Sequence, residues 1–213
     1  MNVELDLHLH TSASDGKLSP GELVRFVASK GLKQFAITDH DTTLSLEEAT
    51  IVTQQFNDLE VIPGIELSTS FRDEEVHILG YHLDPLCQNL QSVLHDFRSE
   101  RKVAIRQTVE KLREAHIILD WQRVLEIAGE GAIGRPHIAH ALLEQGYIKH
   151  FGEAFEKYIG RGCIGYVERP KITSEQACDL IISAGGVPVL AHPKYLKSPT
   201  TIVEFLLPYG LSG

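Results

Sequence analysis

Two histidines spaced two residues apart near the start of the chain are the first residues that could carry chemistry. His8 and His10 occur in the sequence DLHLH at positions 6–10, where alternate residues of a strand project from one face. Two neighbouring imidazoles can hold one divalent cation. The same spacing also occurs on solvated sheet edges, so at this point both interpretations stay open.

Further histidines and carboxylates stand at or near the ends of predicted strands. The sequence TDHD stands at the end of a predicted strand at 34–38. Glu66 follows the apolar residues 61–65 of a predicted strand at 59–67, and His192 follows a predicted strand at 187–191 and precedes a proline. His77 and His82 are five residues apart on a predicted strand at 76–83, so at most one of them faces this site. Because loops at the carboxyl ends of parallel strands build active sites in α/β folds, the pattern favours a metal site over scattered surface histidines.

The elements that must position these residues form an α/β pattern. Strand-like alternation at 3–9 is followed by capping sequences at Ser19 and Ser45 and by further strands, and this order predicts a parallel sheet. Between 90 and 158 the pattern changes to charged amphipathic helices, and a capped helix at Thr173 then resumes the α/β order. We therefore predict a first part at 1–90, a helical insertion at 91–168 and a continuation at 169–213.

Composition narrows the class of protein. The 213 residues are 43% hydrophobic and carry a formal charge of −9, from 20 Lys and Arg against 29 Asp and Glu, so no DNA-binding patch is expected. Three cysteines without C-x-x-C spacing favour a reducing, cytoplasmic location. The polar start and the broken apolar runs predict neither a signal peptide nor a membrane span.

The motifs together resemble the PHP (polymerase and histidinol phosphatase) family of phosphoesterases. The resemblance rests on HLHTSASDG at 8–16, ITDHDT at 37–42, PGIE at 63–66 and AHP at 191–193. GRPHIA at 134–139 and the stretch 158–169 resemble the branch of nucleotide bisphosphate phosphatases and 5′-3′ exoribonucleases. The resemblance implies a distorted (β/α)7 barrel with a helical insertion and two or three divalent metals. Manganese is the expected metal, with zinc, magnesium or iron as alternatives.

The resemblance also implies a ligand set. His8 and His10 would hold a first metal, and Glu66 would bridge it to a second metal held by His77 and His192. Asp15 and His40 would hold a third. The implied reaction is attack of a metal-bound hydroxide on a phosphate ester of a nucleotide or a short 5′-phosphorylated RNA, and the same residues would be catalytic.

Cations in the insertion are candidates for contacts with substrate. Arg135 and His137 flank a proline at a predicted helix start, where they could grip a phosphate or could only cap and pack the helix. Lys171 is a weaker candidate for the same role, and Trp121 is assigned to the core of the insertion. The remaining histidines are assigned to the surface or to helix packing: His82, His95, His116, His140 and His150.

One departure from the family pattern concerns the end of the chain. The family pattern closes with a Gly-Ser-Asp-x-His motif, whereas this sequence stops at 211–213 with LSG. We expect a fragment that lacks two strands and the last metal ligands, with weak activity compared with a longer form. Two alternative functions stay open: a non-catalytic metal-binding PHP module and a small-metabolite phosphatase of the histidinol-phosphate type.

Overall fold

The computed structural model describes residues 4–129, 131–168 and 171–213, so the predicted start of the first strand at Val3 lies outside the described residues. The chain divides into two units. The sheet unit consists of Met1–His95 and Lys171–Gly213, and the helical unit consists of Asp96–Pro170. Among the described residues, no helix combines the length and the apolar character that crossing a membrane would need.

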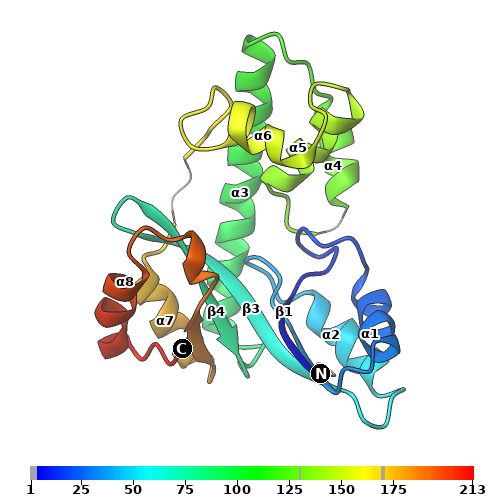
Figure 1. Ribbon diagram of the computed structural model, residues 1–213, viewed down its shortest axis with the longest axis vertical. Helices are drawn as coiled ribbons and strands as arrows, with labels where there is room; N and C mark the ends of the chain where they lie inside the picture. The colour runs from blue at the N-terminus through cyan, green and yellow to red at the C-terminus, as the bar shows by residue number, and fades with distance from the viewer. Residues whose placement is uncertain (1–3, 130, 169–170) are drawn as a thin grey trace. The chain divides into compact units, whose positions relative to one another are not determined.

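A five-stranded mixed sheet forms the sheet unit and confirms the α/β class (Figure 1). The strands lie in chain order across the sheet: β1 (Leu5–Leu9), β2 (Gln34–Ile37), β3 (Glu60–Phe71), β4 (Glu74–Tyr81) and β5 (Val187–Leu190). The first three strands are parallel, but β4 is antiparallel to both β3 and β5. Only Arg72 and Asp73 separate β3 from β4, and a two-residue connection can join only antiparallel strands. The prediction of an entirely parallel sheet was therefore wrong.

Helices of the sheet unit pack beside the strands. In Figure 1, α1 (Pro20–Ser29) and α2 (Ser45–Thr53) lie side by side, and their apolar residues share a core with Phe35 and Ile37 of β2. The predicted capping box of α1 is confirmed, because Ser19 accepts from the Glu22 amide while the Glu22 carboxylate accepts from the Ser19 amide.

The predicted capping box at Ser45 is wrong. Leu44 occupies the cap position of α2 without a side-chain hydrogen bond, because the Ser45 hydroxyl donates to the buried carboxylate of Asp39 instead. The hydrogen bond from Ser45 to Asp39, which lies outside the helix, thus replaces the hydrogen bond that would cap the helix. The corresponding hydrogen bonds at Thr173 do form, and they begin α7 (Ser174–Ser183). The chain continues through β5 to α8 (Pro199–Leu206).

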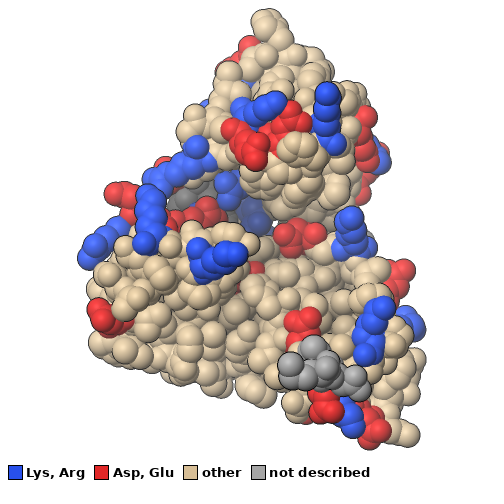
Figure 2. Space-filling view, in the orientation of Figure 1, with Lys and Arg blue, Asp and Glu red and all other residues tan. Residues whose placement is uncertain are grey.

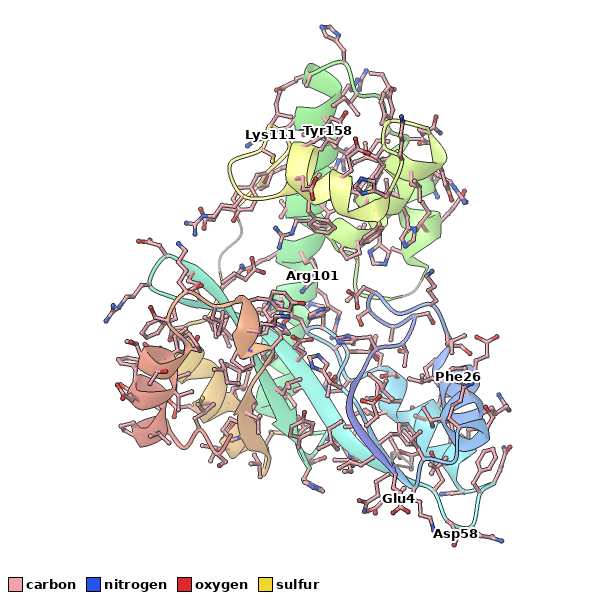
Figure 3. The ribbon with its side chains drawn as sticks, in the orientation of Figure 1. Glu4, Phe26, Asp58, Arg101, Lys111 and Tyr158 are labelled. Carbon is pink, nitrogen blue, oxygen red and sulfur yellow. The ribbon has the colours of Figure 1, made fainter. Side chains whose placement is uncertain are left out.

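The helical unit has an aliphatic core. α3 (Gln88–Glu114) begins in the sheet unit and ends in the helical unit, so the boundary between the units crosses a helix. The other helices are α4 (Trp121–Ala128), α5 (Arg135–Glu144), α6 (Phe151–Ala154) and a short π-helix at Phe155–Ile159. Trp121 and Tyr158 pack against the buried core of this unit, and Figure 3 labels Tyr158.

Candidate metal centre

The carboxylate of Glu66 lies at the centre of a group of side chains of the types that bind metals. We call these seven residues, with Glu66 included, the Glu66 cluster: His8, His10, Asp15, His40, Glu66, His77 and His192. The Glu66 side chain is 1% exposed. Its Oε2 atom lies 3.0 Å from His8 Nε2 and 3.2 Å from His10 Nε2. Its Oε1 atom lies 2.8 Å from His77 Nδ1 and 2.9 Å from His192 Nε2. One buried carboxylate therefore brings together imidazoles from distant parts of the chain.

Asp15 and His40 complete the cluster on one side. Asp15 Oδ1 lies 3.4 Å from His10 Nδ1, and Asp15 Oδ2 lies 3.7 Å from His40 Nε2. His40 Nδ1 lies 3.4 Å from Glu66 Oε2, so His40 stands between the two carboxylates. Three groups have potential ligand atoms within 4.8 Å of one another: His8, His10 and Glu66; His10, Asp15 and His40; and His40, Glu66 and His77.

Strand geometry delivers these side chains. His8 lies in β1, and His10 and His40 follow the ends of β1 and β2. Glu66 lies inside β3 and not at its end, which corrects the prediction that the strand stops at 67. His77 reaches the cluster from inside the antiparallel β4, where it is paired with Ser68. The prediction that Glu66 stands at the end of its strand was therefore wrong, whereas His77 lies inside a strand as predicted.

His192 occupies an unusual backbone conformation directly after β5. Its φ of 31° and ψ of 58° lie in the left-handed region, which non-glycine residues rarely adopt. Ala191 donates its amide to the His77 carbonyl at 3.0 Å, and this bond fixes the chain just before the histidine. Backbone strain of this kind persists where the surrounding structure determines the conformation, as it does at functional sites.

Asp39 is a buried carboxylate that organises the loop after β1. It accepts hydrogen bonds from the Thr11 amide and hydroxyl at 2.7 Å, from the Ser14 hydroxyl at 2.6 Å and from the Ser45 hydroxyl. These bonds hold the loop that leads directly to Asp15. Asp39 belongs to the ITDHDT motif, but no role was predicted for it from the sequence. Its position as an acidic residue near the end of a buried apolar strand was the signal that could have indicated one.

Asp41 plays a similar part on the other side of His40. Its amide donates to the Glu66 carbonyl at 3.0 Å, and its carboxylate accepts from the Ser68 amide at 2.8 Å. The loop between these aspartates is thereby fastened to β3, and His40 is held against Glu66. Both aspartates are fully buried, so their carboxylates act inside the protein, where they fix the loops beside Asp15 and His40.

Contacts with Glu66 shift the pKa values of several groups in the cluster. Burial by itself raises the pKa of this carboxyl, but hydrogen bonds from His10, His192, His77 and His8 lower its pKa far below the usual range. Burial lowers the pKa of His77 as well, yet the hydrogen bonds to Glu66 and Glu75 raise that pKa to about 9. The same opposition leaves the pKa of His10 raised. Contacts with the Glu66 carboxylate therefore favour the protonated forms of His10 and His77.

His40 differs from His10 and His77 in the direction of its pKa shift and in its hydrogen bonding. Burial lowers the pKa of His40 to about 4, outweighing the attraction of Glu66 and Asp15, so this imidazole is neutral near pH 7. Its buried Nδ1 atom has no hydrogen-bond partner among the described residues. A neutral imidazole nitrogen that faces carboxylates without a hydrogen bond fits a metal ligand. The mixture of imidazole nitrogen and carboxylate oxygen fits divalent manganese, zinc or iron.

The two predicted substrate residues lie in the helical unit. His137 is 6% exposed, and its Nδ1 accepts a hydrogen bond from the Gly134 amide at 2.9 Å, which caps the start of α5. Arg135 lies 6.0 Å from the centre of the Tyr166 ring. The packing role of His137 is thus present. A contact with phosphate stays a prediction for both residues.

The other histidines lie where they were predicted. His82, His95, His116 and His150 are exposed, and His140 packs its ring 5.0 Å from that of Phe151. His82 also follows the end of β4, so of the pair predicted to lie on opposite faces it is His77 that reaches the cluster.

The comparison with protein families gives the class of this protein. The family model of the PHP domain matches residues 6–162, and the chain therefore belongs to the PHP domain family. This match confirms the resemblance drawn from the motifs. It also agrees with a fold in which imidazoles and carboxylates gather on one sheet.

Particular relatives are phosphoesterases. The chain is 39% identical over 192 residues to the 5′-3′ exoribonuclease Rnm of Salmonella typhimurium, covering 90% of this chain and 66% of the relative. It is 32% identical over 213 residues to the 3′,5′-nucleoside bisphosphate phosphatase of Chromobacterium violaceum, covering 99% of this chain and 74% of the relative. The chain thus spans about two thirds of the length of the exoribonuclease.

A solved structure supports the fold. An amidohydrolase from Chromobacterium violaceum, with bound sulfate and no metal, is similar with a TM-score of 0.92 and 31% identity. The similarity covers 99% of this chain and 76% of that chain. The α/β fold of this chain is therefore that of the PHP phosphoesterases.

Proposed function

We propose that this chain is the core of a metal-dependent phosphoesterase that hydrolyses phosphate esters of nucleotides or short 5′-phosphorylated RNA. The observation that carries the proposal is the convergence of five imidazoles and Asp15 around the buried Glu66, with His40 Nδ1 left without a hydrogen bond. The named activities of the relatives, an exoribonuclease and a nucleoside bisphosphate phosphatase, support the substrate class. The proposed location is the cytoplasm, which suits three free cysteines.

The proposed ligand assignment divides the cluster into three sites. His8 and His10 would hold a first metal, and Glu66 would bridge it to a second held by His77 and His192. Asp15 and His40 would hold a third. The proposed metal is manganese. When bound, such metals lower the pKa of a coordinated water and neutralise phosphate charge.

Residues of the chain would also orient the substrate. Arg135 supplies a permanent positive charge that suits a phosphate. In His137, the hydrogen bond from the Gly134 amide makes Nδ1 an acceptor, so the neutral ring carries its proton on Nε2. That N–H is the group that would donate to a phosphate oxygen. On the face drawn in Figure 2, Lys and Arg lie among Asp and Glu, which suits a small substrate better than a long duplex.

The test is manganese-dependent hydrolysis. We expect the chain, stripped with a chelator and then given manganese, to show at most weak release of phosphate from adenosine 3′,5′-bisphosphate or of nucleotides from a short 5′-phosphorylated RNA, and a longer form that carries an Asp-x-His motif to be far faster. A variant with both His8→Ala and His10→Ala serves as the inactive control. Metal binding without turnover of any phosphate ester, both by this chain and by a longer form that carries an Asp-x-His motif, would instead support a non-catalytic metal-binding module. Turnover restricted to histidinol phosphate would support the small-metabolite alternative.

The substrate role of Arg135 is tested separately. Arg135→Ala should weaken substrate binding by about 1.5–3 kcal/mol, the contribution typical of a charge-assisted hydrogen bond. Manganese content should not change, because Arg135 has no part in the proposed ligand set. Loss of folding, seen as a lower unfolding midpoint, would instead assign Arg135 to packing.

A further inference from the structure

Glu75 links a proposed metal ligand to a nearly buried lysine. Glu75 lies two residues before His77 on β4, so both side chains project from the same face of the strand. Its Oε1 atom lies 3.4 Å from His77 Nε2, and its Oε2 atom lies 2.8 Å from Lys171 Nζ. His77 turns its other nitrogen, Nδ1, to Glu66 at 2.8 Å. A continuous series of contacts thus runs from Lys171 through Glu75 and His77 to the centre of the cluster.

Lys171 is held in place by its own surroundings. Its side chain is only 13% exposed, although lysine is among the residues that are least often buried without a partner. The segment that follows it is fastened to the end of β3, where the Ser70 amide donates to the Ile172 carbonyl at 3.0 Å and Ser70 forms a parallel bridge with Thr173. The ammonium group is therefore presented to Glu75 by a fixed backbone.

We propose that Glu75 is a positioning residue of the metal centre, which holds the His77 ring through Nε2 and is itself held by Lys171. The proposal rests on the proposed metal centre. Histidine ligands almost always donate their second ring N–H to a carboxylate, a carbonyl or water, which fixes the tautomer and makes the coordinating nitrogen a better ligand. Here the carboxylate of Glu75 places the proton on Nε2 and leaves Nδ1, the atom that faces Glu66, to bind the cation.

This assignment changes the expected role of Lys171. A lysine that gripped a substrate phosphate would alter substrate affinity and leave metal affinity unchanged. A lysine that holds Glu75 would alter metal affinity, whether or not a substrate is present. The two roles therefore separate in an experiment that contains no substrate.

The experiment compares Glu75→Gln with Glu74→Gln in the full chain. Metal-free protein is titrated with Co²⁺, and both the affinity and the visible absorption spectrum of the bound ion are recorded. Glu74 is the matched control because it is the neighbour of Glu75 on β4 and its Oε1 accepts a hydrogen bond from the Lys197 amide at 2.8 Å. We expect Glu75→Gln to weaken at least one cobalt site by about tenfold or more and to shift its spectrum, since loss of such a partner typically costs 10–100-fold. Glu74→Gln should leave both unchanged.

Two lysine variants and one histidine variant make the result decisive. Lys171→Met should reproduce part of the loss, and Lys171→Arg should restore the affinity because it keeps the charge. If Glu75→Gln binds cobalt as Glu74→Gln does while His77→Ala weakens binding, the positioning role is overturned and the metal centre stands. If the wild-type chain binds no cobalt, both proposals fail. If Glu75→Gln loses affinity only in proportion to a lower unfolding midpoint, its role is structural and the proposal is overturned.

Discussion

The sheet unit and the helical unit bury different kinds of side chain. The sheet unit buries the carboxylates of Asp39, Asp41 and Glu66 together with many hydroxyl groups. Among the described residues of the helical unit, the buried polar side chains are those of Thr108 and His137, and the core is otherwise apolar. One unit has a polar interior built around the Glu66 cluster, and the other has an ordinary hydrophobic core.

This difference separates function from stability. Burying a carboxylate is unfavourable unless hydrogen bonds and opposite charges compensate it, whereas burying apolar surface is favourable by itself. Burial of the carboxylates in the sheet unit therefore costs free energy, and the hydrogen bonds that offset this cost also fix the positions of the proposed ligands. Substitutions of the proposed ligands should alter metal binding, whereas substitutions of aliphatic residues in the helical core should alter the free energy of unfolding and leave metal binding unchanged.

The largest expected effect is at Glu66. Glu66→Gln keeps the size of the side chain but removes the charge shared by the imidazoles, and we expect manganese affinity to fall by more than the roughly 100-fold that can follow loss of an outer hydrogen-bond partner. The signal of free Mn²⁺ in electron paramagnetic resonance measures this affinity. Glu144→Gln is the control, because Glu144 pairs with Arg123 in the helical unit. Equal affinity in the two variants would contradict the central place of Glu66.

A cavity in the helical core should give the opposite result. Leu142 is fully buried, and Leu142→Ala should lower the free energy of unfolding by about 2–5 kcal/mol. Urea denaturation measures the loss. Manganese affinity of the folded protein should stay at the wild-type value, and a parallel fall in affinity would break the distinction between the two units.

A smaller effect is expected from the hydrogen bonds around Asp39. Ser45→Ala removes one donor to this buried carboxylate and should cost about 1.5–3 kcal/mol, the range for a hydrogen bond to a charged group. Thr50 is an exposed residue on the same helix, and Thr50→Ala removes a hydroxyl that donates to the Leu46 carbonyl, which should cost less than about 0.5 kcal/mol. Urea denaturation of both variants provides the comparison. Equal losses of the free energy of unfolding in the two variants would contradict the stabilising role of the hydrogen bond to Asp39.

The smallest perturbation uses the native cysteines as reporters. Burial raises the pKa of Cys178 in the sheet unit to about 11, and since the thiolate is the reactive form, iodoacetamide at pH 8 should modify Cys87 and Cys163 before Cys178. Manganese should slow Cys178 further, because a bound ligand stabilises the folded unit. Mass spectrometry of timed samples measures each rate. Modification of Cys178 as fast as Cys163 would contradict its burial.

Local signals in the sequence and the family motifs were sufficient to predict much of the fold and the residues that gather around Glu66. The helix starts at Ser19 and Thr173 were predictable because capping depends on residues three apart. His8 and His10 were recognisable because side chains two apart share a face of a strand. The motifs of the family then added Asp15, His40 and Glu66.

Features without a clear local sequence signal account for what the sequence did not predict. The hairpin at Arg72 and Asp73 reverses β4, but the turn carries no proline or glycine to mark it. Ser45 has the sequence of a helix cap, yet Asp39 captures its hydroxyl through a tertiary contact. The position of Glu75 between His77 and Lys171 depends on residues almost a hundred positions apart. Such contacts exist only once the fold has formed.

The most direct test of the account is anomalous diffraction at the manganese absorption edge, from crystals of the chain soaked in manganese. The account predicts at least two anomalous peaks inside the Glu66 cluster, with Glu66 in contact with both and with His8 and His77 beside different peaks. Absence of a peak inside the cluster at saturating manganese, or peaks only at surface carboxylates, would contradict the assignment of this cluster as a metal centre.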